Sequence, residues 1–289
     1  MTATVLKTQD GTELSVRISG REDGPTMLLC DGIGCDGFVW RYVRRDFEAQ
    51  FRVVHFHYRG HGLSAMPRDE SSLSVEQFAA DAWHLLDLLE IDRAILWGHS
   101  MGVQVILEAA FQHPERVIAL VPMCGAYEKP LSTFHNSGMA ARVLPAVSGL
   151  VLGKPDVVRD VWRTVVPTEL AYWFAVATEI NVRMIQREDF LPYLDHLSRM
   201  DPVVFVTLLE RLAAHSTRPY LRDLKMPALV FAGSRDRFTP ARLSQELTDL
   251  LPGAELCTIP GGSHTAPLEL PDLVTLRAER FFREHAILA

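Results

Sequence analysis

Apolar positions along the first 125 residues fall into two alternating kinds of segment. Short apolar runs and residues of alternating polarity predict strands, whereas apolar residues three and four positions apart predict helices. Strands are expected at 12–19, 27–30, 51–56, 94–97 and 117–123, and helices at 39–47, 74–89 and 103–111. Strands and helices in this alternation are typical of a parallel sheet that carries helices on both faces.

The alternation stops after residue 124. Residues 126–222 show no clear β run and instead combine helix-like segments with aromatic residues and prolines. Strand-and-helix order then returns, with strands expected at 228–232 and 255–259 and helices at 241–251 and 268–285. We therefore predict that residues 1–125 and 223–289 form an α/β core and that residues 126–222 form an inserted helical cap.

A serine framed by glycines follows the strand expected at 94–97. The segment Gly98-His99-Ser100-Met101-Gly102 lies between that strand and a helix, which is the context of a nucleophile elbow. The glycines are needed because a side chain at either place would crowd the strand and the helix. Ser100 is therefore expected to project its hydroxyl from a sharp turn. His99 is adjacent in the chain, cannot readily present its ring to that hydroxyl, and is expected to pack or hydrogen-bond locally.

Two polar residues follow the later predicted strands. Asp236 comes after the strand at 228–232, and His264 comes after the strand at 255–259. A serine hydroxyl needs a base to take its proton and an acid to orient that base, and such groups gather beyond the carboxyl ends of parallel strands. We expect Ser100 to attack an acyl carbonyl, with His264 as the base and Asp236 as the residue that orients its imidazole.

The glycine-rich loop after the second predicted strand supplies the expected oxyanion hole. One donor is the backbone N–H of Met101, directly after the nucleophile. The other is the backbone N–H of Ile33, because Gly32 and Gly34 let the chain turn inward there. Residues 32–37 also match the spacing G-x-G-x-x-G, but no acidic ribose partner follows a strand at the required place, so phosphate binding by this loop is less favoured.

Composition excludes several classes of protein. The chain has 289 residues, 48% of them hydrophobic, which is ample for a substantial core. A formal net charge of −7 and a pI of about 5.9 argue against nucleic acid as a partner. The arginines of Arg41–Arg45 are interpreted as a solvated helix face. No metal-ligand spacing is visible, and the proposed chemistry needs no cofactor.

Cysteine usage and the absence of apolar leader segments suggest a cytoplasmic protein. Cys30, Cys124 and Cys257 lie in apolar runs and are predicted to be buried free thiols, whereas Cys35, in the glycine-rich loop, is expected to be exposed. No signal peptide is apparent, and no apolar run is long enough to predict a membrane span.

These motifs together resemble the α/β-hydrolase superfamily, in particular its cap-bearing serine esterases and cofactor-free haloperoxidases. The resemblance covers almost the whole chain, and it rests on Gly98–Gly102, Asp31–Gly34, Tyr58–Ser64 and Gly262–Pro271. It implies the α/β-hydrolase fold: a mostly parallel eight-stranded sheet with helices on both faces, an inserted cap and a Ser-His-Asp triad. Epoxide hydrolases and haloalkane dehalogenases of similar fold use an aspartate nucleophile, and Ser100 argues against both.

Two positions depart from the family pattern. The oxyanion loop usually begins His-Gly and here reads Asp31-Gly32, and His57 stands where an aspartate usually begins the turn at 58–64. A carboxylate near an oxyanion hole opposes the developing negative charge unless hydrogen bonds hold it away. We hypothesise that Asp31 and His57 form an exchanged polar pair.

The residues favour hydrolysis of a carboxylic ester through an acyl-enzyme, with thioesters and lactones left open. The apolar and aromatic residues of 126–222 favour a small substrate with an apolar acyl or alcohol group. Five of them are interpreted as cap packing rather than ligand contacts: Met139, Leu144, Trp162, Trp173 and Phe174. Alternatives with the same triad are C–C bond or peptide hydrolysis and perhydrolase or haloperoxidase activity, and an alternative of another class is a small-ligand receptor built on a slow hydrolase.

Overall fold

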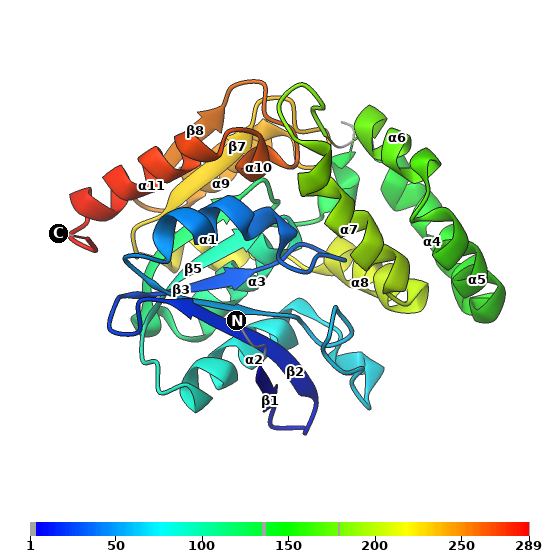
Figure 1. Ribbon diagram of the computed structural model, residues 1–289, viewed down its shortest axis with the longest axis horizontal. Coiled ribbons are helices and arrows are strands. Elements are labelled where there is room, and N and C mark those ends of the chain that lie inside the picture. Colours follow the sequence, from blue (N-terminus) through cyan, green and yellow to red (C-terminus); the bar gives the residue numbers. More distant parts are fainter. Residues whose placement is uncertain (1–3, 135–136, 179, 289) are drawn as a thin grey trace.

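The chain folds around an eight-stranded sheet (Figure 1). The structure is a computed structural model that describes residues 4–134, 137–178 and 180–288. The strands lie in the order β1-β2-β4-β3-β5-β6-β7-β8; β2 is antiparallel to β1 and β4, and the other neighbours are parallel. Their bounds are β1 Thr4–Lys7, β2 Glu13–Gly20, β3 Thr26–Cys30, β4 Arg52–Phe56, β5 Ala94–His99, β6 Val117–Met123, β7 Leu229–Gly233 and β8 Glu255–Ile259. The predicted mostly parallel sheet is confirmed.

Helices cover both faces of this sheet. The helices α2, α3 and α9 pack on one face, and α1, α10 and α11 pack on the other. The side chain of Ser74 caps α2 by accepting a hydrogen bond from the N–H of Gln77. The bounds are α1 Arg41–Phe47, α2 Val75–Leu88, α3 Met101–Gln112, α9 Ala241–Leu250, α10 Ala266–Glu269 and α11 Pro271–Glu284. The last two replace the single helix expected at 268–285.

The segment between β6 and β7 is helical throughout its regular structure. Its helices gather on one side of the molecule, at the right in Figure 1. Their bounds are α4 Met139–Gly153, α5 Pro155–Val165, α6 Glu169–Thr178, α7 Arg187–Arg199 and α8 Pro202–Ala214. Short 3-10 helices lie at Phe38–Trp40, Glu70–Ser72, Pro114–Arg116, Pro130–Ser132 and Arg218–Asp223. The division into a core and a cap at residues 126–222 stays a prediction, and His135, Asn136 and Glu179 of that segment lie outside the described residues.

The central strands place the loops that carry the candidate residues. Every residue of β3, β5 and β7 is buried, as expected for parallel strands covered on both faces. Because β3, β5, β7 and β8 run in the same direction, the loops at their carboxyl ends meet at one edge of the sheet. These are the loops that contain Ile33, Ser100, Asp236 and His264.

All four cysteines are buried free thiols. The expectation that Cys35 is exposed is therefore wrong. Its Sγ lies 3.6 Å from the carbonyl oxygen of Ile33, and the loop folds over it so closely that a Cβ on Gly32 would lie 3.2 Å from the sulfur. Within the described ranges, no helix is both long and apolar enough to cross a membrane.

Candidate active site

Ser100 occupies a sharp turn between β5 and α3. Its backbone has φ 55° and ψ −115°, a conformation that residues other than glycine rarely adopt. A Cβ on Gly98 would collide with the carbonyl oxygen of Gly102, and a Cβ on Gly102 would collide with that of Cys30. The two glycines therefore allow the close approach that this turn requires, for the steric reason that the sequence suggested.

The three side chains proposed from the sequence meet at the edge of the sheet. The Oγ of Ser100 lies 3.0 Å from Nε2 of His264, and Nδ1 of His264 lies 3.0 Å from Oδ2 of Asp236. Since the carboxylate accepts, the neutral imidazole carries its proton on Nδ1 and offers Nε2 as an acceptor to the serine hydroxyl. His264 and Asp236 are buried, so their interaction is shielded from water.

Asp236 is held by its own loop in addition to His264. Its Oδ1 accepts hydrogen bonds from the N–H groups of Phe238 and Thr239 at 2.8 and 2.9 Å, and its Oδ2 accepts one from the Thr239 hydroxyl at 2.9 Å. Only a carboxylate accepts all of these bonds at once. The Phe238 ring also stacks on the His264 ring with 4.9 Å between centroids, which restricts the rotation of the imidazole.

His99 makes the local contact that its position suggested. Its Nε2 lies 2.9 Å from the carbonyl oxygen of His264, so Nε2 carries the proton and donates. Burial, followed by the charge of His264, lowers the pKa of His99 to about 4, and its ring is therefore neutral at pH 7. His99 thus connects the nucleophile turn to the backbone of the histidine loop.

Glu269 supports the histidine loop, a role that the sequence did not assign to it. This buried carboxylate accepts hydrogen bonds from the N–H of Ser263 at 2.6 Å and from the hydroxyls of Ser263 and Thr265. It also accepts a bond from the N–H of Asn181, 3.0 Å away in the segment between β6 and β7. The sequence feature that could have indicated this role is the position of Glu269 in the segment Gly262–Pro271, shortly after His264.

The loop after β3 lies against Ser100. A Cβ on Gly32 would lie 3.1 Å from Cβ of Ser100, so a side chain there would crowd the serine. Gly34 has φ 68°, which turns the chain at the residue after Ile33. Met101 is the first residue of α3, and the N–H of a first helical residue has no partner within its helix. Both N–H groups named from the sequence therefore belong to the segments that adjoin Ser100.

Asp31 pairs with His55 and not with His57 as hypothesised. Its Oδ2 lies 2.8 Å from Nε2 of His55, and its Oδ1 accepts a hydrogen bond from Nε1 of Trp40 at 2.7 Å. Burial alone would raise the pKa of Asp31, but the charge and hydrogen bond of His55, together with His57 and Trp40, lower it. The carboxylate that departs from the family pattern is thus buried and held by two donors. His57 instead accepts a hydrogen bond from the N–H of Leu63 at 3.0 Å.

The five residues of the segment 126–222 that the sequence suggested as cap packing divide into two groups. Leu144 is buried beside Val151, and Trp162 is partly buried, with its Nε1 donating to the carbonyl oxygen of Leu197 at 2.7 Å. The side chains of Met139, Trp173 and Phe174 are instead more than half exposed, so their interpretation as cap packing is wrong. Among the described residues, no group of His, Cys, Asp or Glu side chains is placed to hold a metal ion.

Known proteins resemble this chain in sequence and in fold. The family model of the alpha/beta hydrolase fold matches residues 25–157. A putative carbamate hydrolase, RutD, of a Caulobacter species is 26% identical, over 92% of this chain and 93% of that protein. Polyketide synthase ThaQ of Burkholderia thailandensis is 29% identical over 91% of this chain, which spans only 12% of the synthase.

Solved structures resemble this chain over nearly its whole length. A hydrolase from Pseudomonas aeruginosa PA01 superposes with a TM-score of 0.80 at 23% identity, covering 97% of this chain and 98% of that one. The enol-lactonase from Burkholderia xenovorans LB400 superposes with a TM-score of 0.76 at 24% identity, covering 97% and 100%. At these identities the likeness concerns the fold.

Proposed function

Because this chain has the α/β-hydrolase fold, we propose that it is a serine hydrolase that cleaves carboxylic esters with an apolar acyl or alcohol group. The observation that carries the proposal is the continuous line of hydrogen bonds from Ser100 through His264 to Asp236. A serine with a base, and a base with an orienting carboxylate, is the arrangement that acyl transfer requires. The same chemistry extends to thioesters and lactones.

The first half of the proposed reaction forms an acyl-enzyme. The Oγ of Ser100 attacks the carbonyl carbon while Nε2 of His264 takes the hydroxyl proton, and Asp236 stabilises the resulting imidazolium. The carbonyl oxygen becomes an oxyanion that the N–H groups of Met101 and Ile33 stabilise. When the tetrahedral intermediate collapses, the bond to the alcohol oxygen breaks, and His264 returns its proton to that oxygen.

The second half repeats these steps with water. His264 takes a proton from a water molecule, whose oxygen attacks the acyl carbon attached to Ser100. The bond to Oγ then breaks, the proton returns to Oγ, and the carboxylic acid leaves. Acid and base are thus the same imidazole, used twice in each turnover.

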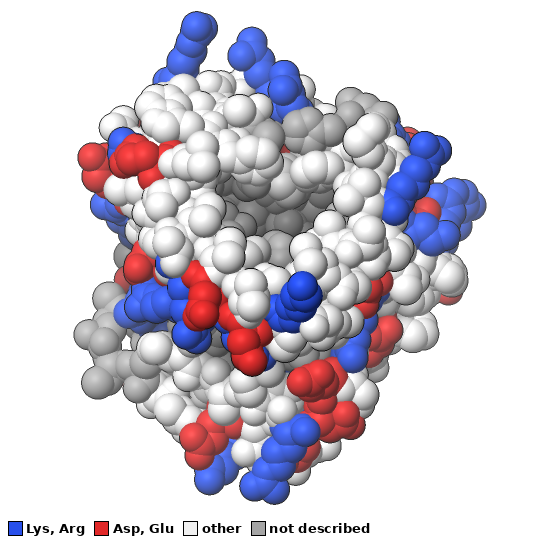
Figure 2. All heavy atoms as spheres, turned by 90° about the vertical axis from the view of Figure 1, so that its right-hand side faces the viewer, with Lys and Arg blue, Asp and Glu red and all other residues white. Residues whose placement is uncertain are grey.

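Apolar surface near the helices α4, α5 and α6 supports the proposal that the substrate is apolar. Most of the large apolar side chains that the structure leaves exposed, among the residues described, lie between Met139 and Leu191. Figure 2 shows the side of the molecule that these helices form, with a hollow framed mainly by uncharged side chains. Exposed apolar patches of this extent mark binding surfaces more often than inert ones. We infer that the segment 126–222 acts as a cap that selects the substrate.

The experiment that tests this function is turnover of p-nitrophenyl esters of increasing acyl length by the wild type and by Ser100→Ala. We expect release that depends on Ser100 and a kcat/KM that rises with chain length through at least the short acyl groups. Absence of Ser100-dependent release for every ester would reject the esterase. A single stoichiometric burst would favour a receptor built on a slow hydrolase.

A further inference from the structure

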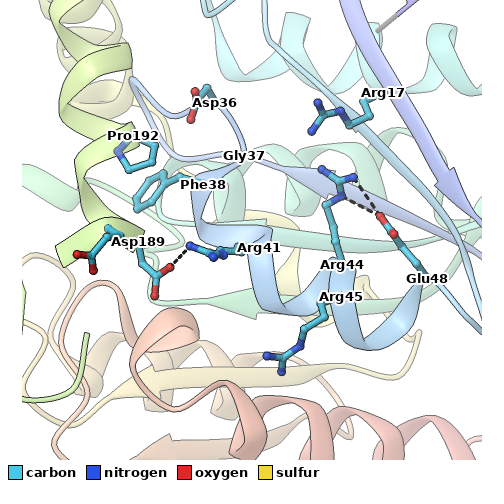
Figure 3. Close-up of a pocket in the computed structure, with 11 residues that line it drawn as sticks. Arg17, Asp36, Gly37, Phe38, Arg41, Arg44, Arg45, Glu48, Asp189 and Pro192 are labelled. Atoms are coloured by element: carbon cyan, nitrogen blue, oxygen red, sulfur yellow. Dashed lines mark hydrogen bonds and ion pairs between the residues drawn. The ribbon is translucent and has the colours of Figure 1, made fainter. Parts of the chain in front are cut away.

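Two adjoining cavities lie outside the triad and share Arg17 and Asp36 in their walls. The first, of about 410 Å³, lies between β2, α1 and α7 (Figure 3). The second, of about 380 Å³, is lined among others by Ser15, Arg17, His55, His57, His196 and Arg199. Neither is lined by Ser100, Asp236 or His264. The second cavity is notable because almost every side chain in its wall is a hydrogen-bonding group.

The register of the sheet explains why these polar side chains gather. β2 and β4 pair antiparallel with Arg17 opposite His55, and the N–H of His57 donates to the carbonyl oxygen of Ser15 at 3.0 Å. Residues two apart on a strand point to the same face, so Ser15 and Arg17 share a face with His55 and His57. The helix α7 adds His196 and Arg199 to this cavity.

Arg17 carries a charge that the protein does not neutralise. Its side chain forms neither an ion pair nor a hydrogen bond with the described part of the chain. Its neighbours in the first cavity are different: Arg44 bonds to Glu48 at 3.0 Å, and Arg41 bonds to Asp189. In Figure 3, the guanidinium of Arg17 extends toward that of Arg44.

The histidines of the second cavity have donors to spare. The side chain of His196 is only 5% exposed, and its Nε2 is buried with no hydrogen-bond partner among the described residues. A buried polar atom without a partner is costly, and a ligand that supplies the missing bond recovers that cost. His57 accepts the Leu63 N–H at Nδ1, so its Nε2 carries a proton and is a donor.

We propose that the second cavity is a binding site for a phosphate-type oxyanion, held by Arg17 as the charged ligand and by His57, His196 and Arg199 as further donors. Guanidinium groups bind such anions through charge-assisted hydrogen bonds, and the N–H of a neutral imidazole adds a further donor. A cation is disfavoured, because no described group of side chains is placed to hold a metal. The proposal is independent of the proposed hydrolase function, since it uses no residue of the triad.

Asp36 makes the proposal sharply testable. It is the carboxylate in the wall of this cavity, and its Oδ2 lies 3.8 Å from Nδ1 of His196. Burial, and then the charge of Asp31, raises the pKa of Asp36, so it becomes neutral more readily than an ordinary aspartate. A negative charge here opposes an anion, and its removal is therefore expected to strengthen binding.

The test is calorimetric titration of the whole protein with inorganic phosphate and with phenyl phosphate, at constant ionic strength and pH 7. We expect saturable binding that weakens about tenfold in Arg17→Gln, because one charge-assisted bond is lost. Binding should tighten severalfold in Asp36→Asn, and a gain of affinity cannot come from misfolding. Arg93→Gln, which changes an exposed arginine outside both cavities, is the matched control and should leave binding unchanged.

Each result of this titration either supports or overturns the proposed phosphate site. Tighter binding of phenyl phosphate supports the site and identifies an organic phosphate as its ligand, whereas equal binding supports the site for the free anion. Absence of saturable binding to the wild type overturns the proposal. So does equal binding by Arg17→Gln, provided that its melting temperature shows it to be folded.

Discussion

Nε2 of His99 donates a hydrogen bond to the carbonyl oxygen of His264 across 2.9 Å, which ties the residue before the proposed nucleophile to the proposed base. The contact joins two loops that are far apart in the sequence. It fixes the backbone of His264 relative to Ser100, and it acts without touching the reacting atoms. His99 is therefore a positioning residue.

Removing this donor should impair the chemical step more than substrate binding. We expect His99→Phe to lower kcat about tenfold with little change in KM, because a small displacement of a base is costly. His99→Gln, which can donate from its amide, should recover much of the loss. Steady-state kinetics with one p-nitrophenyl ester make the comparison, and an unchanged kcat in the phenylalanine variant would show that the contact does not position His264.

Asp236→Asn should be far more damaging. An amide at this place presents its NH2 group either to the N–H donors of Phe238 and Thr239 or to the Nδ1–H of His264, and it cannot stabilise an imidazolium. We expect kcat to fall by a factor of about 10⁴, as in other Ser-His-Asp triads that lose this carboxylate. Asp249→Asn, at an exposed position of α9, is the control and should be neutral. A kcat within a few-fold of wild type would remove Asp236 from the mechanism.

Removing Asp31 and removing His55 from their buried pair should lower the free energy of unfolding by unequal amounts. His55→Phe leaves a buried carboxylate with only the Trp40 donor, and we expect a loss of about 3–5 kcal/mol in the free energy of unfolding. Asp31→Asn removes the charge and keeps an acceptor, and we expect a loss of about 1–3 kcal/mol. Urea unfolding at pH 7 gives both values, and the reverse order would contradict an ionised Asp31.

Stability should fall as the pH drops from 6.5 toward 4. Burial, as the leading cause, lowers the pKa of His57, His61 and His99 to about 4, while unfolded histidine titrates near 6.5. Between these values the unfolded chain binds protons that the folded chain excludes, so acidification favours unfolding. Asp36 opposes this trend, because its raised pKa means that the folded chain binds this one proton more readily than the unfolded chain.

The measurement is the free energy of unfolding in urea at several pH values from 7 to 5. His61→Phe removes one of these titrating groups and should reduce the dependence of the unfolding free energy on pH by about one proton. Phenylalanine fits at this position because the ring of His61 lies among the aromatic side chains of Tyr58 and Phe78. A stability that rises on acidification would contradict buried neutral histidines.

The proximity of Ser100, Asp236 and His264 could be predicted from the sequence because it depends on the order of the strands that precede them. Ser100, Asp236 and His264 each follow a parallel strand, and parallel strands bring such positions to one edge whatever their packing. The partner of Asp31 depended on finer geometry. The register of β3 with β4 sets Leu29 beside His55 and, if it continued, would set Asp31 beside His57. The strand ends at Cys30, however, and Asp31 bonds to His55 instead.

The predictions for Cys35 and Trp173, which the structure shows buried and exposed respectively, were wrong for a different reason. Local polarity reports the average environment of a segment, whereas burial depends on what a distant segment covers. The loop of Cys35 lies under α7 and its following turn, where a Cβ on Gly34 would touch Leu197 and lie 3.6 Å from Met200. No periodicity in the sequence shows that contact.

The measurement closest to the central claim is the intact mass of the protein quenched in acid during turnover of a p-nitrophenyl ester, followed by peptide mapping. The expected result is a mass increase of one acyl group, located on Ser100, which is absent in Ser100→Ala and accumulates when deacylation is slowed. Steady hydrolysis with no acyl group on Ser100, or with the group on another residue, would contradict Ser100 as the nucleophile.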